Sequence, residues 1–263
     1  MYASNVEALV LLLGAFGATS ALWTLQARSR LREDAQRARQ LATWLDADTQ
    51  VAVHLAKHVA ASRGQPLAPV HVLYALVQAE PVADAIRALD GDPVAIEAAI
   101  DARLDGAGAD PAALGDPRDA TRLLGIALGL ARSHEREMTL ADALNQIAHT
   151  EAAALLAPVS ALALLFRLVH GEAPPAVSLW GETHVHVVIR NDDYTTQELV
   201  VAALRDAFGL PADRAETVMR EAHVRGKAIV GRYAADLAKA KIADVRARAA
   251  QHGAPFWIGV EVC

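Results

Sequence analysis

The chain has 263 residues and a mass of 27.9 kDa, which is enough for two modest domains with cores of their own. Hydrophobic residues make up 53% of it but aromatic residues only 5%, so the cores must be built mainly from Ala, Leu and Val, a composition that favours helices. The net charge of −6 argues against binding to nucleic acid, which requires a clustered basic face. The single cysteine, Cys263, excludes an internal disulfide and offers no metal-ligand spacing.

The first predicted element is an apolar helix near the N-terminus. The segment from Ala8 to Leu25 carries no charge and would form a helix of about 27 Å, close to the thickness of a bilayer core. Five arginines follow it within residues 26–39, whereas Glu7 is the charged side chain that precedes it. We therefore expect a single-pass anchor in a bacterial-type inner membrane, with the downstream domains facing the cytoplasm. A cleaved signal peptide is the competing interpretation, but its positive charge would come before the apolar run.

An internal repeat follows in residues 48–170, after the anchor and helical spacer assigned to residues 1–47. Segments around Leu67 and Met138 align at an offset of 71 residues, and each contains an amphipathic helix, a short polar turn and a second helix. Further helices are predicted over residues 82–89, 94–104, 152–156 and 159–169, and the two copies are joined by a Gly- and Pro-rich segment at 106–119. The simplest architecture is two half-domains of four short helices packed on each other.

The pattern changes after a linker at residues 171–181. Residues 182–263 predict the order strand, helix, helix, strand, helix, strand. These elements are expected at residues 184–190, 197–208, 213–224, 227–232, 235–251 and 256–261. Together they describe an α+β domain of about 80 residues, a size that folds by itself.

A candidate binding site lies in this last domain. Asn191 and Asp192 follow the first predicted strand, and His223 lies near the end of the second predicted helix. An amide oxygen, a carboxylate and an unprotonated imidazole nitrogen would provide three acceptors for a small cation such as an α-ammonium group. No nucleophile lies nearby, so this pattern indicates binding rather than catalysis. Alternatively, the run from Asn191 to Asp193 could serve only as a strand exit and helix N-cap.

Other candidate chemistry is weaker. His184 and His186 could ligate a metal only with a third ligand, and none is evident in the sequence. Glu221 and Asp236 could pair as acid and base, but both fit solvated helix faces. We therefore predict no catalytic residue, no metal site and no cofactor, and we do not expect an enzyme.

The repeat resembles the double repeat of the Clp N-terminal domain, a docking module that precedes the ATPase modules of Clp unfoldases. The likeness is carried by the turn and by the run from Val70 to Leu76 in the first copy. In the second copy Asp142, Asn145 and Gln146 interrupt the apolar run, so the likeness is weaker there. The chain has no Gly-x-x-x-x-Gly-Lys-Ser/Thr motif and is not expected to be a Clp ATPase.

The last domain closely resembles the adaptor ClpS through its residues 191–195, 221–231 and 255–261. The resemblance implies a three-stranded antiparallel sheet and recognition of N-degrons, which are destabilising N-terminal residues. It implies an ammonium site formed by Asn191, Asp192 and His223. It also implies an apolar pocket lined by Ile189, Thr195, Gln197, Val200, Met219, Ala222 and Phe256. Gln197 stands where the family more often has Met, which puts the usual preference for Leu, Phe, Tyr and Trp in question.

We therefore expect a multidomain α and α+β chain with an N-terminal transmembrane helix, an all-α double Clp repeat and a C-terminal ClpS-like domain. Its expected function is that of a membrane-tethered adaptor that presents N-degron proteins to a Clp AAA+ unfoldase and its protease. Docking is expected on a face bearing Val224, Asp236 and Lys241, which the chain's own repeat domain could occupy. The alternative is a scaffold or decoy that sequesters substrates or regulates an unfoldase without delivering cargo.

Overall fold

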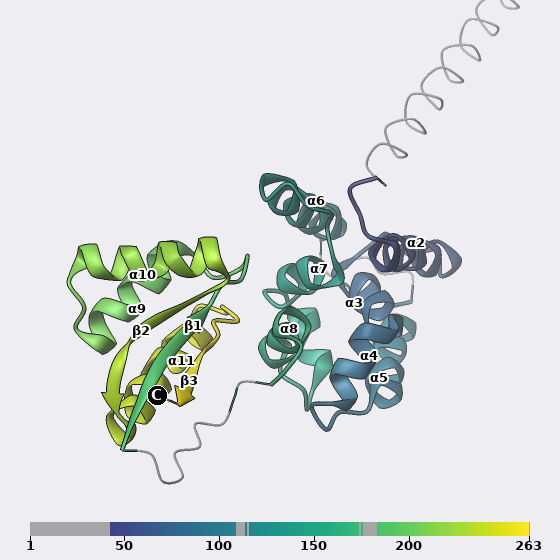
Figure 1. Cartoon of the computed structure of the whole chain (residues 1–263). Coiled ribbons are helices and arrows are strands. Elements are labelled where there is room, and N and C mark those ends of the chain that lie inside the picture. Colours follow the sequence, from purple (N-terminus) through teal and green to yellow (C-terminus); the bar gives the residue numbers. More distant parts are fainter. Residues whose placement is uncertain (1–42, 109–113, 115, 174, 176–182, 263) are drawn as a thin grey trace, which may run out of the picture. The chain divides into compact units, whose positions relative to one another are not determined.

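The computed structural model describes residues 43–108, 114, 116–173, 175 and 183–262 (Figure 1). The chain divides into two units after Leu45, and every element described below belongs to the second unit. The transmembrane helix predicted over residues 8–25 lies outside the described residues. Within those residues no helix is both long and apolar enough to cross a membrane. The longest helices there have 17 residues and carry several charges, so the expected fold class is corrected to a helical region followed by an α+β domain.

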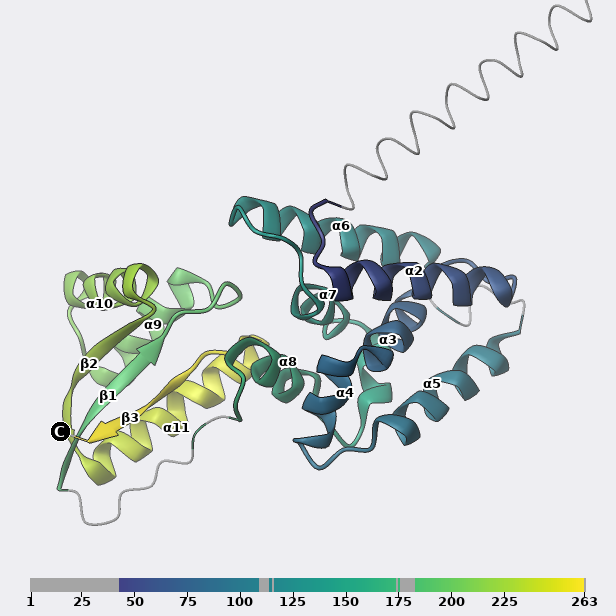
Figure 2. The same cartoon turned by 45° about the vertical axis from the view of Figure 1, so that its right-hand side comes forward.

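Among its described residues, the helical region includes four helical elements in each copy of the repeat, and their arrangement is shown in Figures 1 and 2. The third element of the second copy is a 3₁₀ helix rather than an α-helix. In chain order the elements are α2 (Ala47–Ser62), α3 (Pro69–Gln78), α4 (Glu80–Arg87), α5 (Pro93–Ala107), α6 (Pro117–Ser133), α7 (Leu140–Ile147), η2 (Glu151–Leu156) and α8 (Ala161–His170).

Short polar side chains fix the starts of these helices. The carboxylates of Asp46, Asp92 and Asp116 and the hydroxyl of Ser160 accept hydrogen bonds from backbone N–H groups in the first turns of α2, α5, α6 and α8. Gly171, with φ of 71°, ends α8 in a left-handed conformation that suits glycine. Because Asp116 already caps α6, the segment between the two copies ends earlier than residue 119.

The two copies carry a buried hydrogen-bonded pair at equivalent positions. In the first copy His71 Nε2 lies 3.0 Å from Gln65 Oε1, and burial lowers the pKa of His71, so its imidazole stays neutral. In the second copy, 71 residues later, Arg136 donates to both oxygens of Asp142 at 2.7 and 2.9 Å. His71 and Asp142 also each accept from the backbone N–H that precedes their helix. The second copy therefore has a charged pair where the first has a neutral one.

The C-terminal domain has the expected β-α-α-β-α-β order and a three-stranded antiparallel sheet. The strand order is β2-β1-β3, with β1 in the centre. Its elements are β1 (His184–Arg190), α9 (Gln197–Phe208), α10 (Ala212–Arg225), β2 (Lys227–Ala234), α11 (Ala235–Gln251) and β3 (Ile258–Val262).

The two faces of this sheet have different neighbours. Val185, Val187 and Ile189 point into a core to which α9, α10 and α11 all contribute. Val188 points to the opposite face, where it forms a small buried cluster with Trp257 and with Phe166 of α8. The sheet is therefore apolar on both faces at its centre, and the helical region packs on the second face.

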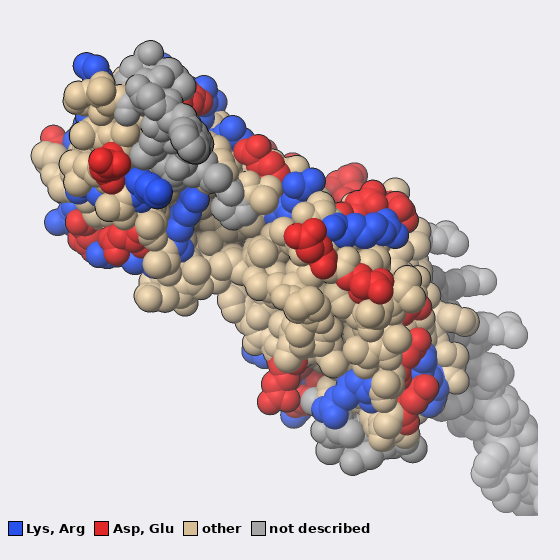
Figure 3. Space-filling model, turned by 90° about the horizontal axis from the view of Figure 1, so that it is seen from below, with Lys and Arg blue, Asp and Glu red and all other residues tan. Residues whose placement is uncertain are grey.

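Charged side chains of both signs are mixed on the surface. On the face that Figure 3 shows, Lys and Arg side chains lie among Asp and Glu side chains. Ion pairs on the described surface include Arg87 with Asp84 at 2.6 Å and Arg248 with Asp206 at 2.8 Å. This mixture differs from the continuous basic stripe that typically tracks a phosphate backbone.

Candidate functional site

A cavity of about 370 Å³ opens beside the end of β1. Its volume lies within the range of small-ligand sites. All ten residues predicted for the ammonium site and the apolar pocket line it. They are Ile189, Asn191, Asp192, Thr195, Gln197, Val200, Met219, Ala222, His223 and Phe256.

The apolar end of the cavity is continuous with the domain core. Ile189 is the last inward-facing residue of β1, and Val200 lies on the buried face of α9. Met219 and Ala222 are three residues apart on α10, which places both on one side of that helix. Because these side chains belong to the packed core or contact it, the pocket has a rigid floor. Gln197, the first residue of α9, is exposed.

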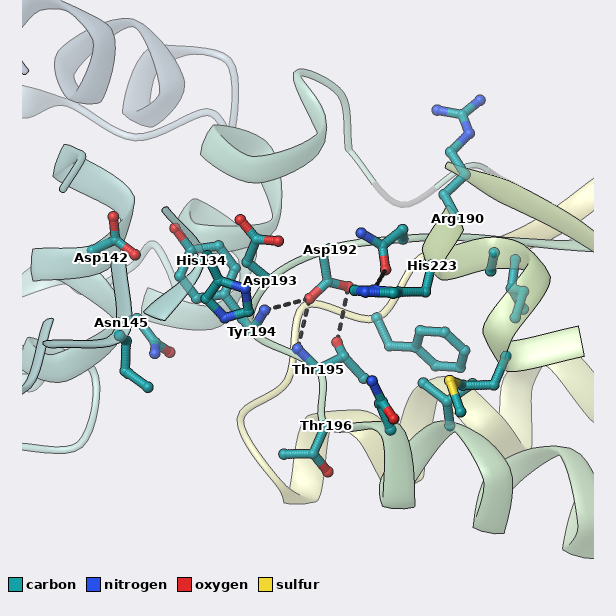
Figure 4. A pocket seen from close by; sticks show the side chains of 18 of the residues that line it. His134, Asp142, Asn145, Arg190, Asp192, Asp193, Tyr194, Thr195, Thr196 and His223 are labelled. Carbon is teal, nitrogen blue, oxygen red and sulfur yellow. Dashed lines mark hydrogen bonds between the residues drawn. The ribbon is translucent and has the colours of Figure 1, made fainter. Parts of the chain in front are cut away.

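The polar end is formed where β1 and α10 both stop. The Asn191 N–H donates to the Gly226 carbonyl at 2.8 Å, and Gly226 ends α10 with φ of 80°, a conformation that favours glycine. This bond holds the strand end against the helix end. As a result His223, in the last turn of α10, places Nδ1 3.4 Å from Asn191 Oδ1 (Figure 4).

Asp192 organises the turn that follows β1. Its Oδ1 accepts from the backbone N–H groups of Tyr194 and Thr195 at 2.9 and 2.6 Å, and its Oδ2 accepts from Thr195 Oγ1 at 2.9 Å (Figure 4). The side chain is only 1% exposed, and this burial raises the pKa of Asp192 against the opposing effect of those hydrogen bonds. Asp192 lines the cavity, but its oxygens already have three donors from its own turn.

The neighbouring carboxylate, Asp193, is the accessible one, since its side chain is 34% exposed. Its Oδ2 accepts from Arg136 Nε at 2.7 Å. Burial by itself would raise the pKa of Asp142, but hydrogen bonds from Arg136 and Thr139 lower it overall, so Asp142 stays ionised. The Arg136 guanidinium and the carboxylates of Asp142 and Asp193 thus form a group with a net charge of −1 beside the cavity.

Sequence reasoning missed the second wall of this cavity, which the helical region supplies. Its residues come from α6, α7 and the turn between them: Leu130, His134, Arg136, Asp142 and Asn145. They lie about fifty residues before the predicted site, too far along the chain for any local pattern to connect them. The signal available was that Asp142 and Asn145 interrupt the apolar run of the second repeat copy.

Further contacts join the helical region to the C-terminal domain. Glu172 accepts from Arg190 Nη1 at 2.8 Å and from the indole N–H of Trp257 at 3.0 Å, and the Arg190 guanidinium lies 3.9 Å from the Trp257 ring centroid. His170 Nε2 donates to the Pro255 carbonyl at 2.7 Å, and burial lowers the pKa of His170, so it is neutral. Of these residues, Arg190 also lines the cavity.

Comparison with known proteins places the C-terminal domain in a family. Residues 181–259 match the family model described as ATP-dependent Clp protease adaptor protein ClpS. The ATP-dependent Clp protease adapter protein ClpS of Oleidesulfovibrio alaskensis is 39% identical over 75 residues, which is 28% of this chain and 72% of that protein. The chain belongs to the ClpS adaptor family.

Two further relatives match the same part of the chain. The ClpS adapter protein of Vibrio cholerae is 43% identical over 60 residues, which is 23% of this chain and 57% of that protein. The solved structure of Agrobacterium tumefaciens ClpS2 bound to L-phenylalaninamide is 30% identical, covers 30% of this chain and 95% of the solved one, and has a TM-score of 0.29. The family match does not extend over residues 48–170, whose likeness to the Clp repeat stays a prediction.

The three residues predicted for docking lie in different environments on the ClpS-family domain. Val224 is 75% exposed at the end of α10, and Asp236 is exposed in the first turn of α11. Lys241 is half-buried, with its ammonium group bonded to the Ala207 carbonyl. Val224 is exposed in this arrangement, and the expectation that the chain's own helical region could occupy this face stays a prediction.

The weaker alternatives find no support in the ClpS-family domain. Among the described residues there is no group of three or more His, Cys, Asp or Glu side chains that could hold a metal ion, so His184 and His186 have no third ligand there. Glu221 pairs with Arg225 at 2.9 Å, four residues further along α10.

Proposed function

We propose that this chain is a ClpS-type adaptor that binds proteins by a free N-terminal residue and presents them to a Clp protease. The observation that supports this most is the single cavity that joins the Asn191 and His223 acceptors to a buried apolar pocket. One end suits an α-ammonium group, and the other suits the side chain on the same residue.

The ammonium group would bind at the polar end. It has three donors and a positive charge, and it needs acceptors in an anionic setting. Asn191 Oδ1 and His223 Nδ1 are close enough to each other to accept from one nitrogen atom. Asp192 and Asp193 supply negative charge from the adjacent turn. Each hydrogen bond to a charged group contributes about 1.5–3 kcal/mol when it is shielded from water.

The first side chain would occupy the apolar end. Burial of a Leu or Phe side chain there contributes about 1.5–3 kcal/mol. The floor is formed by core residues, so little side-chain entropy would be lost when the ligand binds. Gln197 places a polar amide at the start of α9, and we propose that it sets the preference among Leu, Phe, Tyr and Trp.

The proposed partner is a Clp-family AAA+ unfoldase with its protease, since the relatives are named as adapters of the ATP-dependent Clp protease. We propose that docking uses the face that bears Val224 and Asp236, both of which are exposed. A degradation assay with the Clp protease and an N-degron substrate distinguishes delivery from sequestration, because a decoy would slow degradation.

The binding proposal is tested by calorimetry on the full chain with peptides that begin with Leu, Phe, Tyr or Trp. N-terminal acetylation removes the charge and should abolish measurable binding. Asn191→Ala and His223→Ala should each weaken binding at least about tenfold, which corresponds to one charged hydrogen bond. His252→Ala, an exposed histidine at the end of α11, is the matched control. Equal affinity for free and acetylated peptides would refute the proposal.

A further inference from the structure

We propose that the helical region forms a second subsite of the same cavity, which receives the residues that follow the N-terminal residue of a bound peptide. This inference rests on the proposed function. The walls of this subsite are Leu130 of α6, His134 in the turn and Asn145 of α7.

The cavity is continuous between its two ends. The C-terminal domain provides the acceptors and the apolar floor, and the helical region provides the opposite wall of the same space. In Figure 4 Asp192 and Thr195 lie between His223 on one side and His134, Asp142 and Asn145 on the other. A peptide whose first residue fills the apolar end must therefore continue along the space that the helical wall borders.

The helical wall contacts the turn that follows the acceptors. Arg136 Nε lies 2.7 Å from Asp193 Oδ2, and Asp193 is two positions beyond Asn191. A peptide whose first residue binds at Asn191 would therefore have the helical wall beside the residues that follow.

The chemistry of the wall suits a peptide backbone and an apolar side chain. No described residue hydrogen-bonds to the Asn145 side-chain amide, which offers both a donor and an acceptor to a backbone amide. Leu130 is 46% exposed and offers apolar surface. Arg136 has all three nitrogens engaged by Asp193, Asp142 and the Glu137 carbonyl, so it holds the wall in place rather than contacting the ligand.

The ligand class follows from these features. The full site recognises an unfolded N-terminal segment of at least three residues, with an apolar residue favoured at the second or third position. A single amino-acid amide fills only the first subsite, because it has no atoms that reach the helical wall.

The test compares two ligands by calorimetry on the full chain. One is a pentapeptide that begins with Leu, Phe, Tyr or Trp, and the other is the amide of its first residue. Wild type should bind the pentapeptide more tightly than the amide. Leu130→Ala and Asn145→Ala should each weaken pentapeptide binding by about fivefold and leave amide binding unchanged. Ile126→Ala is the control for Leu130→Ala, because Ile126 lies on the same helix and is exposed to a similar extent as Leu130. Gln146→Ala is the control for Asn145→Ala, because Gln146 is the next residue along the chain. Neither Ile126 nor Gln146 lines the cavity.

Each outcome decides something. Loss of pentapeptide affinity in the two test variants alone supports the second subsite. Variants that match their controls, or that weaken both ligands equally, overturn it while leaving the proposed function intact. Tighter pentapeptide binding in the test variants also overturns it, because the helical wall would then obstruct the ligand. If wild type binds neither ligand, the proposed function fails and this inference fails with it.

Discussion

Replacing Arg136 with Ala should destabilise the second unit of the chain, because it removes the cation from a buried carboxylate. The Asp142 side chain is 3% exposed, and Arg136 donates to both of its oxygens. Leaving a buried charge without its partner costs at least about 3 kcal/mol. We expect a loss of about 3 kcal/mol for Arg136→Ala, because Thr139 still donates two hydrogen bonds to Asp142. The lost contact with the partly exposed Asp193 should add less than about 1 kcal/mol.

The assay is urea unfolding of the full chain, followed by far-ultraviolet circular dichroism. Arg118→Ala is the control, since Arg118 pairs with Asp116 while almost fully exposed, and its removal should leave the midpoint unchanged. In an Asp142→Asn background, Arg136→Ala should cost clearly less than it does alone, because no buried charge remains.

Acid provides a second readout for the same pair. The folded pKa of Asp142 is lowered, so its contribution to stability is present above the unfolded value of about 3.9 and is lost as pH falls through the folded pKa. Asp142→Asn should remove this acid-dependent loss. Unfolding of Arg136→Ala at the wild-type midpoint would contradict this role of Arg136, and so would an effect that persists undiminished in the Asp142→Asn background.

Three other predictions concern separate parts of the molecule. Burial lowers the folded pKa of His71 below the unfolded value of about 6.5, so the free energy of unfolding of the wild type should fall as pH falls from about 6.5 through the folded pKa. In urea titrations across this pH range, His71→Gln should lose less stability than the wild type. Asp192→Ala should lower the free energy of unfolding by about 2 kcal/mol, because it removes the three hydrogen bonds that the Asp192 side chain accepts in the turn. Asp193→Ala should leave the unfolding midpoint nearly unchanged but weaken peptide binding about tenfold, as measured by calorimetry. Val224→Asp should reduce co-purification with the Clp unfoldase while peptide affinity stays at the wild-type value, and a parallel loss of both would contradict a separate docking face.

The sequence predicted the elements of the C-terminal domain closely because each has a clear local signal. β1, α9 and α11 have the predicted bounds. The last strand begins at Ile258 rather than residue 256, because Phe256 belongs to the cavity wall and pairing with β1 starts with Ile258 opposite Ile189. Strand β2 extends to Ala234 because its pairing with β1 continues to His184. The ends of a strand depend on where its hydrogen-bonded partner strand stops. The alternation of apolar and polar residues along one strand does not identify that partner.

The candidate site was predictable in part for a related reason. Spacing relative to the strand and helix ends brought Asn191 and His223 together. It assigned Asp192 to the ammonium site, with a role in the turn as the alternative, and Asp192 accepts three hydrogen bonds from that turn. The helical wall depends on packing between segments far apart in the sequence, and no periodic pattern carries that information. The predicted membrane anchor rested on hydropathy and on the arginines that follow the apolar run, and it lies outside the described residues.

The exchange of Gln65 and His71 in the first repeat copy for Arg136 and Asp142 in the second has a consequence for how the chain assembles. A domain built from two similar halves presents two nearly equivalent surfaces to any neighbour on the same chain. The two surfaces differ in charge at this position. The turn that bears Asp193 forms an ionic contact with Arg136 of the second copy, whereas the neutral Gln65 of the first copy offers no such contact. The second copy thus offers the C-terminal domain an ionic contact, Arg136 with Asp193, at a position where the first copy has the neutral Gln65.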